Sequence, residues 1–327
     1  FASNNIDIYK GSQISTNTTG INVGTDTALG KVKLITSDGV NFTYYNNGAV
    51  DEVSNVAPSA DKMTLWIAGN ISSGNIDARN ASTHSEAELN TNEAVLKAYK
   101  AEKGSDGNIW LTANNKVITE KTSFNTYNST DAAASRNGGN VKITSVNKST
   151  LNADTVNAVG DVKLKATVGD VNVDNSSIIA NDITLDAGNI ASIQNGSDVD
   201  AANVTLQGVK RAQIVGASTV NADNIALEAG DVWFSNSNLK AANSISGNAT
   251  TGYVLSENNT SFDADTIDLN AKTDVKGSYN LNNNKTTMNA GNDVDVQLLN
   301  VGNRAKGLVA IAENDVTVTT PGTLSVS

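Results

Sequence analysis

The chain of 327 residues has no cysteine, two prolines, one histidine and an aromatic content of only 5%. Without cysteine no disulfide can hold the fold, and a cysteine-based zinc site is excluded. The one histidine, His84, lies in a polar stretch where we expect it to be solvated. A single histidine cannot build a histidine-based metal site, and a catalytic triad would depend on it alone. We therefore expect no bound metal, no cofactor and no enzymatic activity.

Long apolar runs and clusters of positive charge are absent as well. No stretch of about 18 consecutive apolar residues occurs, so we expect no membrane insertion in this segment. The formal net charge of -11 is not offset by any basic cluster, which argues against nucleic acid as a partner. Because the chain does not begin with Met, we expect a processed product or a fragment. These features favour an extracellular or cell-surface location.

What the chain does contain is a repeat of about 21 residues through its C-terminal part. Apolar residues keep this period in a first column: Val141, Val162, Ile183, Val204, Ile225, Ile245, Ile267, Met288 and Val309. A second column follows two residues later: Ile143, Leu164, Leu185, Leu206, Leu227, Gly247, Leu269, Ala290 and Ile311. Such a period is typical of repeat architectures, in which each unit buries its apolar face by stacking on the next.

One coil shows how the repeat is built. Ile183 and Leu185 alternate with polar residues, which places both on one face of a strand. After a glycine-containing turn, Ile190 and Ile193 mark a second strand, and after another turn Val199 marks a third. Three short strands per coil predict an all-β parallel β-helix, or β-solenoid. A leucine-rich repeat and a many-stranded β-sandwich are the alternative folds, although the columns mix Val, Ile and Leu and show no helical spacing.

The N-terminal part, residues 1–138, is less regular than residues 139–327, and we predict two portions of one solenoid with this boundary. The spacings from Ile76 to Ile109 and from Ile109 to Val141 exceed the later period by about ten residues. We interpret this surplus as a loop inserted into each coil.

The segment Ala81–Lys103 is the one stretch that predicts a short helix. Insertions in solenoids gather on one face and often carry binding, so this segment either provides a recognition element or covers the flank of the solenoid. Two runs rich in small polar residues, 131–140 and 282–285, predict solvated corners.

Charged residues give no clear catalytic or metal-binding pattern. Asp198 and Asp200 form a pair two residues apart, as do Asp293 and Asp295, and this spacing places each pair on one strand face. No calcium-loop motif occurs, so we interpret these carboxylates as exposed residues rather than cation ligands. The arginines are scattered: Arg79, Arg136, Arg211 and Arg304. They have no recurring acidic partner and so do not mark a polysaccharide-cleaving groove.

The motif that recurs most often is Asn-x-Ser/Thr, the acceptor sequence for N-glycosylation in secreted proteins. The candidate sites are Asn17, Asn41, Asn70, Asn80, Asn128, Asn147, Asn175, Asn195, Asn203, Asn248, Asn258, Asn259 and Asn284. A chain rich in Asn, Ser and Thr also produces this motif by chance, so both interpretations stay open. Because Val204 is predicted to face inward, we expect the side chain of Asn203 to face outward.

Three segments, Ala180–Gly188, Ala222–Gly230 and Ala264–Ala271, share the pattern Ala-Asx-x-Ile-x-Leu-x-Ala. This repeat resembles that of filamentous-haemagglutinin-type adhesins, which are large bacterial exoproteins. The resemblance implies a right-handed parallel β-helix that is exported to the cell surface. The secretion domain of that family carries Asn-Pro-Asn motifs, whereas Pro58 and Pro321 stand in other contexts. The resemblance therefore indicates a shaft segment or a stand-alone solenoid.

These observations predict an extracellular structural or adhesive β-solenoid of a microbial surface or secreted protein, which mediates attachment or forms a fibre. The alternatives are a self-assembling filament, sheath or surface-layer subunit, and a β-helix enzyme that cleaves polysaccharides. The expected partners are copies of the chain itself or molecules on a host or neighbouring cell. The C-terminal segment Thr317–Ser327 carries no charged cap, so we expect further repeats or stacking on another copy.

Overall fold

The computed structural model describes residues 108–128, 139–301 and 307–320, together with separate strand segments between residues 6 and 100. Side chains are described within residues 108–126, 139–299 and 307–320. The chain divides into two compact units. Unit 1 consists of Phe1–Gly169 with Ser176–Asn181, and unit 2 of Asp170–Asn175 with Asp182–Ser327.

Every regular element of the described residues is a β-strand. The strands of unit 1 are β1 (Ile6–Ile8), β2 (Gln13–Ser15), β3 (Gly20–Asn22), β4 (Asn41–Tyr44), β5 (Met63–Ile67), β6 (Asn70–Ser73), β7 (Ile76–Ala78), β8 (Ala81–Ser85), β9 (Glu88–Asn92), β10 (Val95–Lys100), β11 (Ile109–Ala113), β12 (Lys116–Glu120), β13 (Ser123–Asn128), β14 (Val141–Ser145), β15 (Lys148–Asn152), β16 (Thr155–Ala158), β17 (Val162–Ala166) and β19 (Ser177–Ile179). The strands of unit 2 are β18 (Asp170–Asp174), β20 (Asp182–Ala187), β21 (Ile190–Gln194), β22 (Asp198–Val215), β23 (Thr219–Ser235), β24 (Asn238–Ala249), β25 (Val254–Glu257), β26 (Ser261–Ala271), β27 (Val275–Ala290), β28 (Val294–Val301), β29 (Leu308–Ala312) and β30 (Val316–Thr319).

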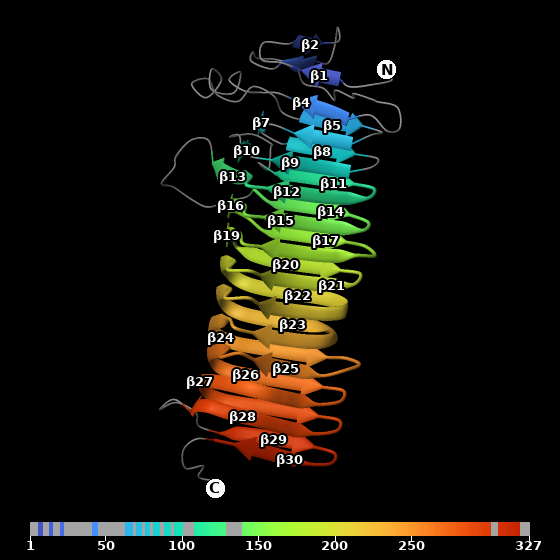
Figure 1. Ribbon diagram of the computed structural model, residues 1–327. Coiled ribbons are helices and arrows are strands. Elements are labelled where there is room, and N and C mark those ends of the chain that lie inside the picture. The colour runs from blue at the N-terminus through green and yellow to red at the C-terminus, as the bar shows by residue number, and fades with distance from the viewer. Residues whose placement is uncertain are drawn as a thin grey trace. The chain divides into compact units, whose positions relative to one another are not determined.

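Successive coils pair through parallel strands in both units. In unit 1, β14 pairs with β11 of the coil before and with β17 of the coil after. In unit 2, β20, β21 and the start of β22 are the first, second and third strand segments of one coil, and β22 continues through the corner into the next coil. The yellow to red strands of Figure 1 show this stacking within unit 2. The predicted all-β parallel β-helix with three short strand segments per coil is confirmed. Only β2 and β3, among the described strands, form an antiparallel pair.

The core of unit 2 is built from the two predicted columns of the first segment. Ile183 stacks on Val204, and their side chains are at most 1% exposed. Leu206 lies between Leu185 and Leu227 in the second column and is fully buried. Burying a side chain of this size contributes about 1.5–3 kcal/mol, so the stack of columns is the main source of stability.

The second segment was predicted correctly at one position and wrongly at another. Ile193 is buried, as expected, but Ile190 is half-buried and its neighbour Ala191 points to the core. Strand alternation requires this, because residues two apart share a face. Further along, Gly247 stands in the second column, where a Cβ would lie 3.3 Å from both Leu269 Cδ2 and Val232 Cγ1.

Near the C-terminus the predicted columns are wrong by two residues at Met288 and by one residue at Val309, because the coil steps there are 19 residues, from 267 to 286, and 22 residues, from 286 to 308. Met288 stacks on Leu269 and belongs to the second column, whereas Thr286 stacks on Ile267 in the first. Val309, expected in the core, faces outward and is 42% exposed. The slip begins with the short coil of 19 residues, since the period elsewhere is about 21. The polar Thr286 concealed the true column in the sequence.

The same slip places other residues differently from the prediction. Ala290 stacks on Ala271 in a column of small residues at the end of the first segment, and Ile311 faces outward at 57% exposure. Asn283 lies in the run 282–285 that was expected to be solvated, but it is only 2% exposed and stacks on Ala264. Its Nδ2 donates to the Oγ1 of Thr286 at 2.6 Å, whereas its Oδ1 is buried without a hydrogen-bond partner.

The predicted helix over Ala81–Lys103 is wrong, because this range contains the strands β8, β9 and β10. Each of them pairs on both sides: β8 with β5 and β11, β9 with β6 and β12, and β10 with β7 and β13. Isolated helical propensity is a weak prior, and parallel pairing with two neighbouring coils outweighs it.

The register in unit 1 also differs from the one expected. Ile109 stacks on Ala81 and not on Ile76, which belongs to the third segment and pairs with Leu96. The true coil steps are therefore 28 residues, from 81 to 109, and 32 residues, from 109 to Val141. The surplus residues fall between β10 and β11 and between β13 and β14, in stretches that lie largely outside the described residues.

The corner between the second and third segments repeats one polar motif. A residue in the left-handed backbone region, such as Asn236 with a φ of 47°, precedes a buried hydroxyl residue. The hydroxyl donates to a carbonyl two or three residues earlier: Ser237 Oγ donates to Ser235 O at 2.9 Å, and Ser218 Oγ donates to Val215 O at 2.8 Å. Thr260 Oγ1 likewise donates to Glu257 O at 2.8 Å. The buried corner residues are Thr122, Asp154, Ser176, Ser197, Ser218, Ser237 and Thr260.

Tyr279 explains the short coil of unit 2. Ser261 pairs with Asn280, so Tyr279 occupies the corner position that Thr260 holds one coil earlier. The corner after Ser256 has four residues before Ser261, whereas the corner after Gly277 has only two before Asn280. The Tyr279 hydroxyl donates to the carbonyl of Lys276 at 3.2 Å, again three residues earlier. A long side chain thus replaces the small corner hydroxyl while its ring fills the core.

Asp154 is the one carboxylate among the described corner residues, and it is 2% exposed. Its Oδ1 accepts from the backbone N–H of Thr122 at 2.7 Å, and its Oδ2 from that of Asn152 at 2.9 Å. The Thr119 hydroxyl donates to the same Oδ2. Burial raises the pKa of Asp154 from 3.8 to about 6, although these hydrogen bonds act in the opposite direction.

The raised pKa of Asp154 predicts a pH-dependent stability. Because folded Asp154 keeps its proton to a higher pH than the unfolded chain, its stabilising contribution is complete below about pH 4 and is lost by about pH 6. The loss amounts to about 3 kcal/mol. Asp154→Ser should abolish this pH dependence, because serine does not ionise in this range. Serine also suits the corner, since Ser176 holds the equivalent position one coil later, where its Oγ accepts the Asp154 N–H at 3.0 Å.

Urea titrations of the parent chain and of Asp154→Ser across this pH range measure the difference. The parent should lose stability relative to the variant as the pH rises, and the two should differ least in acid. Parallel stability curves for the two proteins would contradict the assignment.

Candidate binding face

Outward side chains on the first segments of unit 2 tie one coil to the next. Asn203 Nδ2 donates to Asp182 Oδ1 at 2.7 Å, and Asn224 Nδ2 donates to Asn203 Oδ1 at 2.9 Å. Ser244 Oγ continues the ladder by donating to Asn224 Oδ1 at 2.9 Å. The prediction that the side chain of Asn203 faces outward is confirmed. These ladders hold the outer faces of the coils in register.

The outward positions of the second segments in unit 2 carry a different set of side chains. We call Arg211, Trp233, Tyr253, Leu255 and Lys276 the aromatic face. The Arg211 guanidinium carbon lies 5.2 Å from the centre of the Trp233 ring, and Lys276 Nζ lies 4.4 Å from the centre of the Tyr253 ring. Leu255 pairs with Trp233 on one side and with Lys276 on the other. Two cation–aromatic pairs therefore stand on four neighbouring coils.

Carboxylates hold both cations in place. Arg211 lies 3.9 Å from Asp231, and Lys276 lies 3.9 Å from Asp274. These side chains are 23–42% exposed, so the ion pairs contribute little to stability and act mainly by orienting the cations. The backbone N–H of Tyr253 donates to Asp231 Oδ1 at 3.3 Å.

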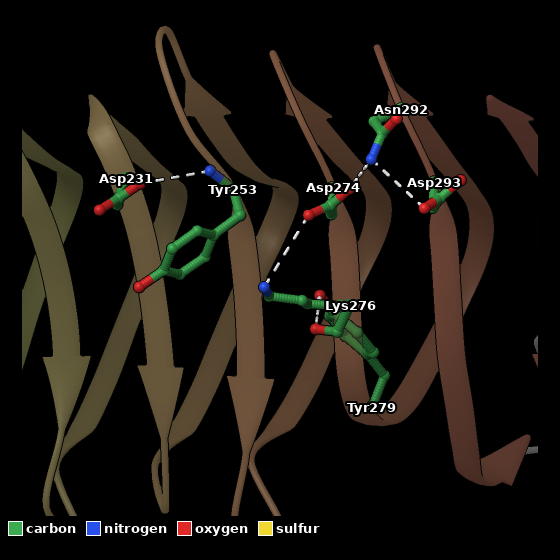
Figure 2. Close-up of polar contacts among 7 residues, drawn as sticks. All are labelled: Asp231, Tyr253, Asp274, Lys276, Tyr279, Asn292 and Asp293. Carbon is green, nitrogen blue, oxygen red and sulfur yellow. Dashed lines mark hydrogen bonds and ion pairs between the residues drawn. The ribbon is translucent and has the colours of Figure 1, made fainter. Parts of the chain in front are cut away.

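Figure 2 shows the contacts of Asp231 with the Tyr253 backbone and of Asp274 with Lys276 on successive coils. Asn292 Nδ2 donates to Asp274 Oδ1 at 2.8 Å and to Asp293 Oδ2 at 3.3 Å, and so links β27 to β28. Lys276 extends from β27 toward Asp274 and the Tyr253 ring, while Tyr279 leaves the strand on another side.

A buried aromatic stack supports the aromatic face from below. The ring centres of Phe234 and Phe262 are 5.1 Å apart, and those of Phe262 and Tyr279 are 5.7 Å apart. All three side chains are fully buried. Burial also raises the pKa of the Tyr279 phenol well above its usual value, so its hydroxyl stays a donor at physiological pH.

An open groove of about 820 Å³ adjoins the aromatic face. Its lining includes Tyr253, which directly precedes β25, and five residues on β25, β27 and β28: Glu257, Lys276, Ser278, Asp295 and Gln297. The groove also borders the short corner at Gly277, whose φ of 109° and close approach to Ser256 O exclude a side chain. The exposed Asn258 and Asn259, at the corner one coil earlier, have no counterpart there. The shorter corner therefore leaves space for the groove.

The described glycosylation motifs fall into two groups. The hydroxyl residues that follow Asn147, Asn195, Asn258 and Asn284 in the motif are buried: Ser149, Ser197, Thr260 and Thr286. Two of them, Ser197 and Thr260, are corner hydroxyls, which explains why the motif arises without any modification. Both polar positions of the motif are exposed at Asn175 with Ser177 and at Asn248 with Thr250. In the motifs that begin at Asn203 and Asn259, the hydroxyl residue is half-buried.

The four aspartates and one of the arginines named from the sequence lie among the described side chains. Asp198, Asp200 and Asp295 are exposed and Asp293 is half-buried; each pair lies on one outward face, as expected. Arg211, which was expected to mark no site, belongs to the aromatic face. His84 lies in β8, where side chains are not described, and the other three arginines and the sequons at Asn17, Asn41, Asn70, Asn80 and Asn128 also lie outside the described side chains.

The described residues hold neither a cluster of metal ligands nor a membrane-spanning helix. No group of three or more His, Asp or Glu side chains there is placed to hold a metal ion. The same residues contain no helix long and apolar enough to cross a membrane.

Comparison of the chain with protein-family models, with curated proteins and with solved structures gives no match. The site must therefore be interpreted from its own geometry. Sequence reasoning missed the aromatic face, although a signal existed: in a chain with few aromatics, Trp233 and Tyr253 occupy outward positions of neighbouring coils.

Proposed function

We propose that this chain is an extracellular structural and adhesive β-solenoid of a microbial surface or secreted protein. The observation that carries the proposal is that three different sets of side chains in unit 2 have three different roles. Its inward columns form a continuous core, its outward polar ladders fix successive coils, and an aromatic, charged face stands on that rigid support. Binding residues are commonly presented by a rigid scaffold, and the half-buried rings of Trp233 and Tyr253 stand on the outer surface of this one.

The resemblance to filamentous-haemagglutinin-type adhesins points in the same direction. It rests on the Ala-Asx-x-Ile-x-Leu-x-Ala pattern, and each position of that pattern has an identifiable place in the coil. Ile and Leu fill the two inward columns. The Asx residues Asn181 and Asp265 each take part in a side-chain hydrogen bond to the neighbouring coil, with Asp161 and Asn284 respectively, both at 3.0 Å. Other solenoids can meet the same demands, so the proposed class is adhesive and structural rather than one named family.

An attachment assay tests the proposal. Beads coated with the purified chain should adhere to epithelial or microbial cell layers several-fold better than beads coated with the heat-unfolded chain. Electron microscopy of the same preparation distinguishes the fibre-forming role, since a filament, sheath or surface-layer subunit should polymerise. Beads that adhere no better than the unfolded control, together with micrographs that show no assembly, would contradict the proposal.

A further inference from the structure

We propose that the groove beside the aromatic face binds an uncharged oligosaccharide chain through Tyr253 and the polar side chains of β25, β27 and β28. This inference rests on the proposed adhesive function and names the chemical class of its ligand. It requires three properties of the groove: a surface for the apolar face of a sugar ring, hydrogen-bonding groups for the hydroxyls, and a charge balance that does not favour an ionic ligand.

The stacking surface is the half-buried ring of Tyr253 with Leu255 beside it. Sugar rings present C–H groups on one face, and these pack against aromatic rings. Lys276 Nζ lies 4.4 Å from the centre of this ring and so covers part of its face. The lysine is held by this contact and by a 3.9 Å contact to Asp274, and its side chain is 42% exposed, so an incoming sugar can displace it at small cost.

The hydroxyl partners are the remaining lining residues. Glu257 and Asp295 offer acceptors, Gln297 offers both an acceptor and donors, and Ser278 offers a hydroxyl. All four side chains are exposed or half-buried. A mixture of an aromatic surface and a few polar groups is typical of ligand sites.

The charge balance selects against acidic ligands. Glu257 and Asp295 are negative, and the positive charge of Lys276 is already shared with Asp274. A sulfated or uronic-acid polymer would meet net repulsion in the groove. An uncharged chain avoids this repulsion and still uses the carboxylates as acceptors.

The spacing of the coils suits a chain ligand rather than a single sugar. Strands of neighbouring coils lie about 4.8 Å apart, which is close to the length of one hexose unit in an extended chain. The lining residues come from three successive coils, and Thr319 of β30 extends the lining to a fourth. Successive sugar units can therefore meet equivalent outward positions on successive coils.

The test is a binding screen with the whole chain. An array of uncharged glucose, mannose, galactose and N-acetylglucosamine oligomers, together with oligogalacturonate and sulfated oligomers, is probed with labelled protein, and hits are measured by calorimetry. At least one uncharged oligomer should bind, and its affinity should not depend on salt concentration. Tyr253→Ala should weaken it by about tenfold or more, and Tyr253→Phe should retain it.

Two further variants serve as matched comparisons. Trp110 is 43% exposed on β11 of unit 1, so Trp110→Ala should leave binding unchanged. Asp295→Ala changes an exposed residue of the groove and should also reduce binding. It tests the proposal independently if Tyr253→Ala lowers the melting temperature measured by circular dichroism. The inference is overturned if no uncharged oligomer binds, if the acidic oligomers bind more tightly, or if neither groove variant reduces affinity. Beads that still attach to cells in those cases would leave the proposed adhesive function standing.

Discussion

Leu206→Asp is expected to lower the free energy of unfolding by about 5 kcal/mol, the largest effect of any substitution considered for this chain. Leu206 is fully buried between Leu185 and Leu227, with apolar columns on both sides. A carboxylate at this position finds no cation in the column and must either be buried with its charge or be protonated. Urea unfolding followed by circular dichroism measures the loss.

The neighbouring position provides the control. Thr205 faces outward between Thr184 and Ala226, so Thr205→Asp keeps its charge in water. The expected change is within about 1 kcal/mol. Equal losses for the two variants would show that the assigned strand register is wrong.

Phe262→Ala is expected to cost about 3–5 kcal/mol, because it removes the central ring of the buried aromatic stack. The rings of Phe234 and Tyr279 lie 5.1 Å and 5.7 Å from it, and no side chain of similar size is available to fill the space. The substitution also withdraws support from Tyr279, whose hydroxyl closes the short corner.

Phe262→Leu separates volume from aromatic contact. It restores much of the lost volume, so it should recover more than half of the stability that Phe262→Ala removes. Thermal unfolding by circular dichroism compares the two variants with the parent. A loss of less than about 1 kcal/mol for Phe262→Ala would mean that the stack does not support this corner.

The candidate for a recognition surface changes with the structure. The sequence left two roles open for Ala81–Lys103, a recognition element or a cover on the flank of the solenoid, but this range forms three strands that pair with the coils on both sides. Deleting it would remove a coil rather than trim a loop. The aromatic face of unit 2 is the better candidate for recognition. Its side chains point outward from the strands, so they can be substituted without altering the residues that pack in the core.

The sequence by itself determined the fold class and most of the core. Alternation with period two places Ile183 and Leu185 on one face whatever surrounds them, and the recurrence of this pair every 21 residues, as at Val204 and Leu206, leaves stacking as the way to bury it. The inward columns could be predicted because their signal is local and is repeated in every coil.

Only the tertiary structure decided the register and the site. The short corner at Tyr279 moves the columns of the following coil by two residues, and this places the polar Thr286 and Asn283 in the core, where they hydrogen-bond to each other. Arg211, Trp233, Tyr253 and Lys276 are separated by about one coil each along the chain, and pairing of neighbouring strands brings them together. A contact of this kind depends on which residues stack, and that depends on the length of every corner between them.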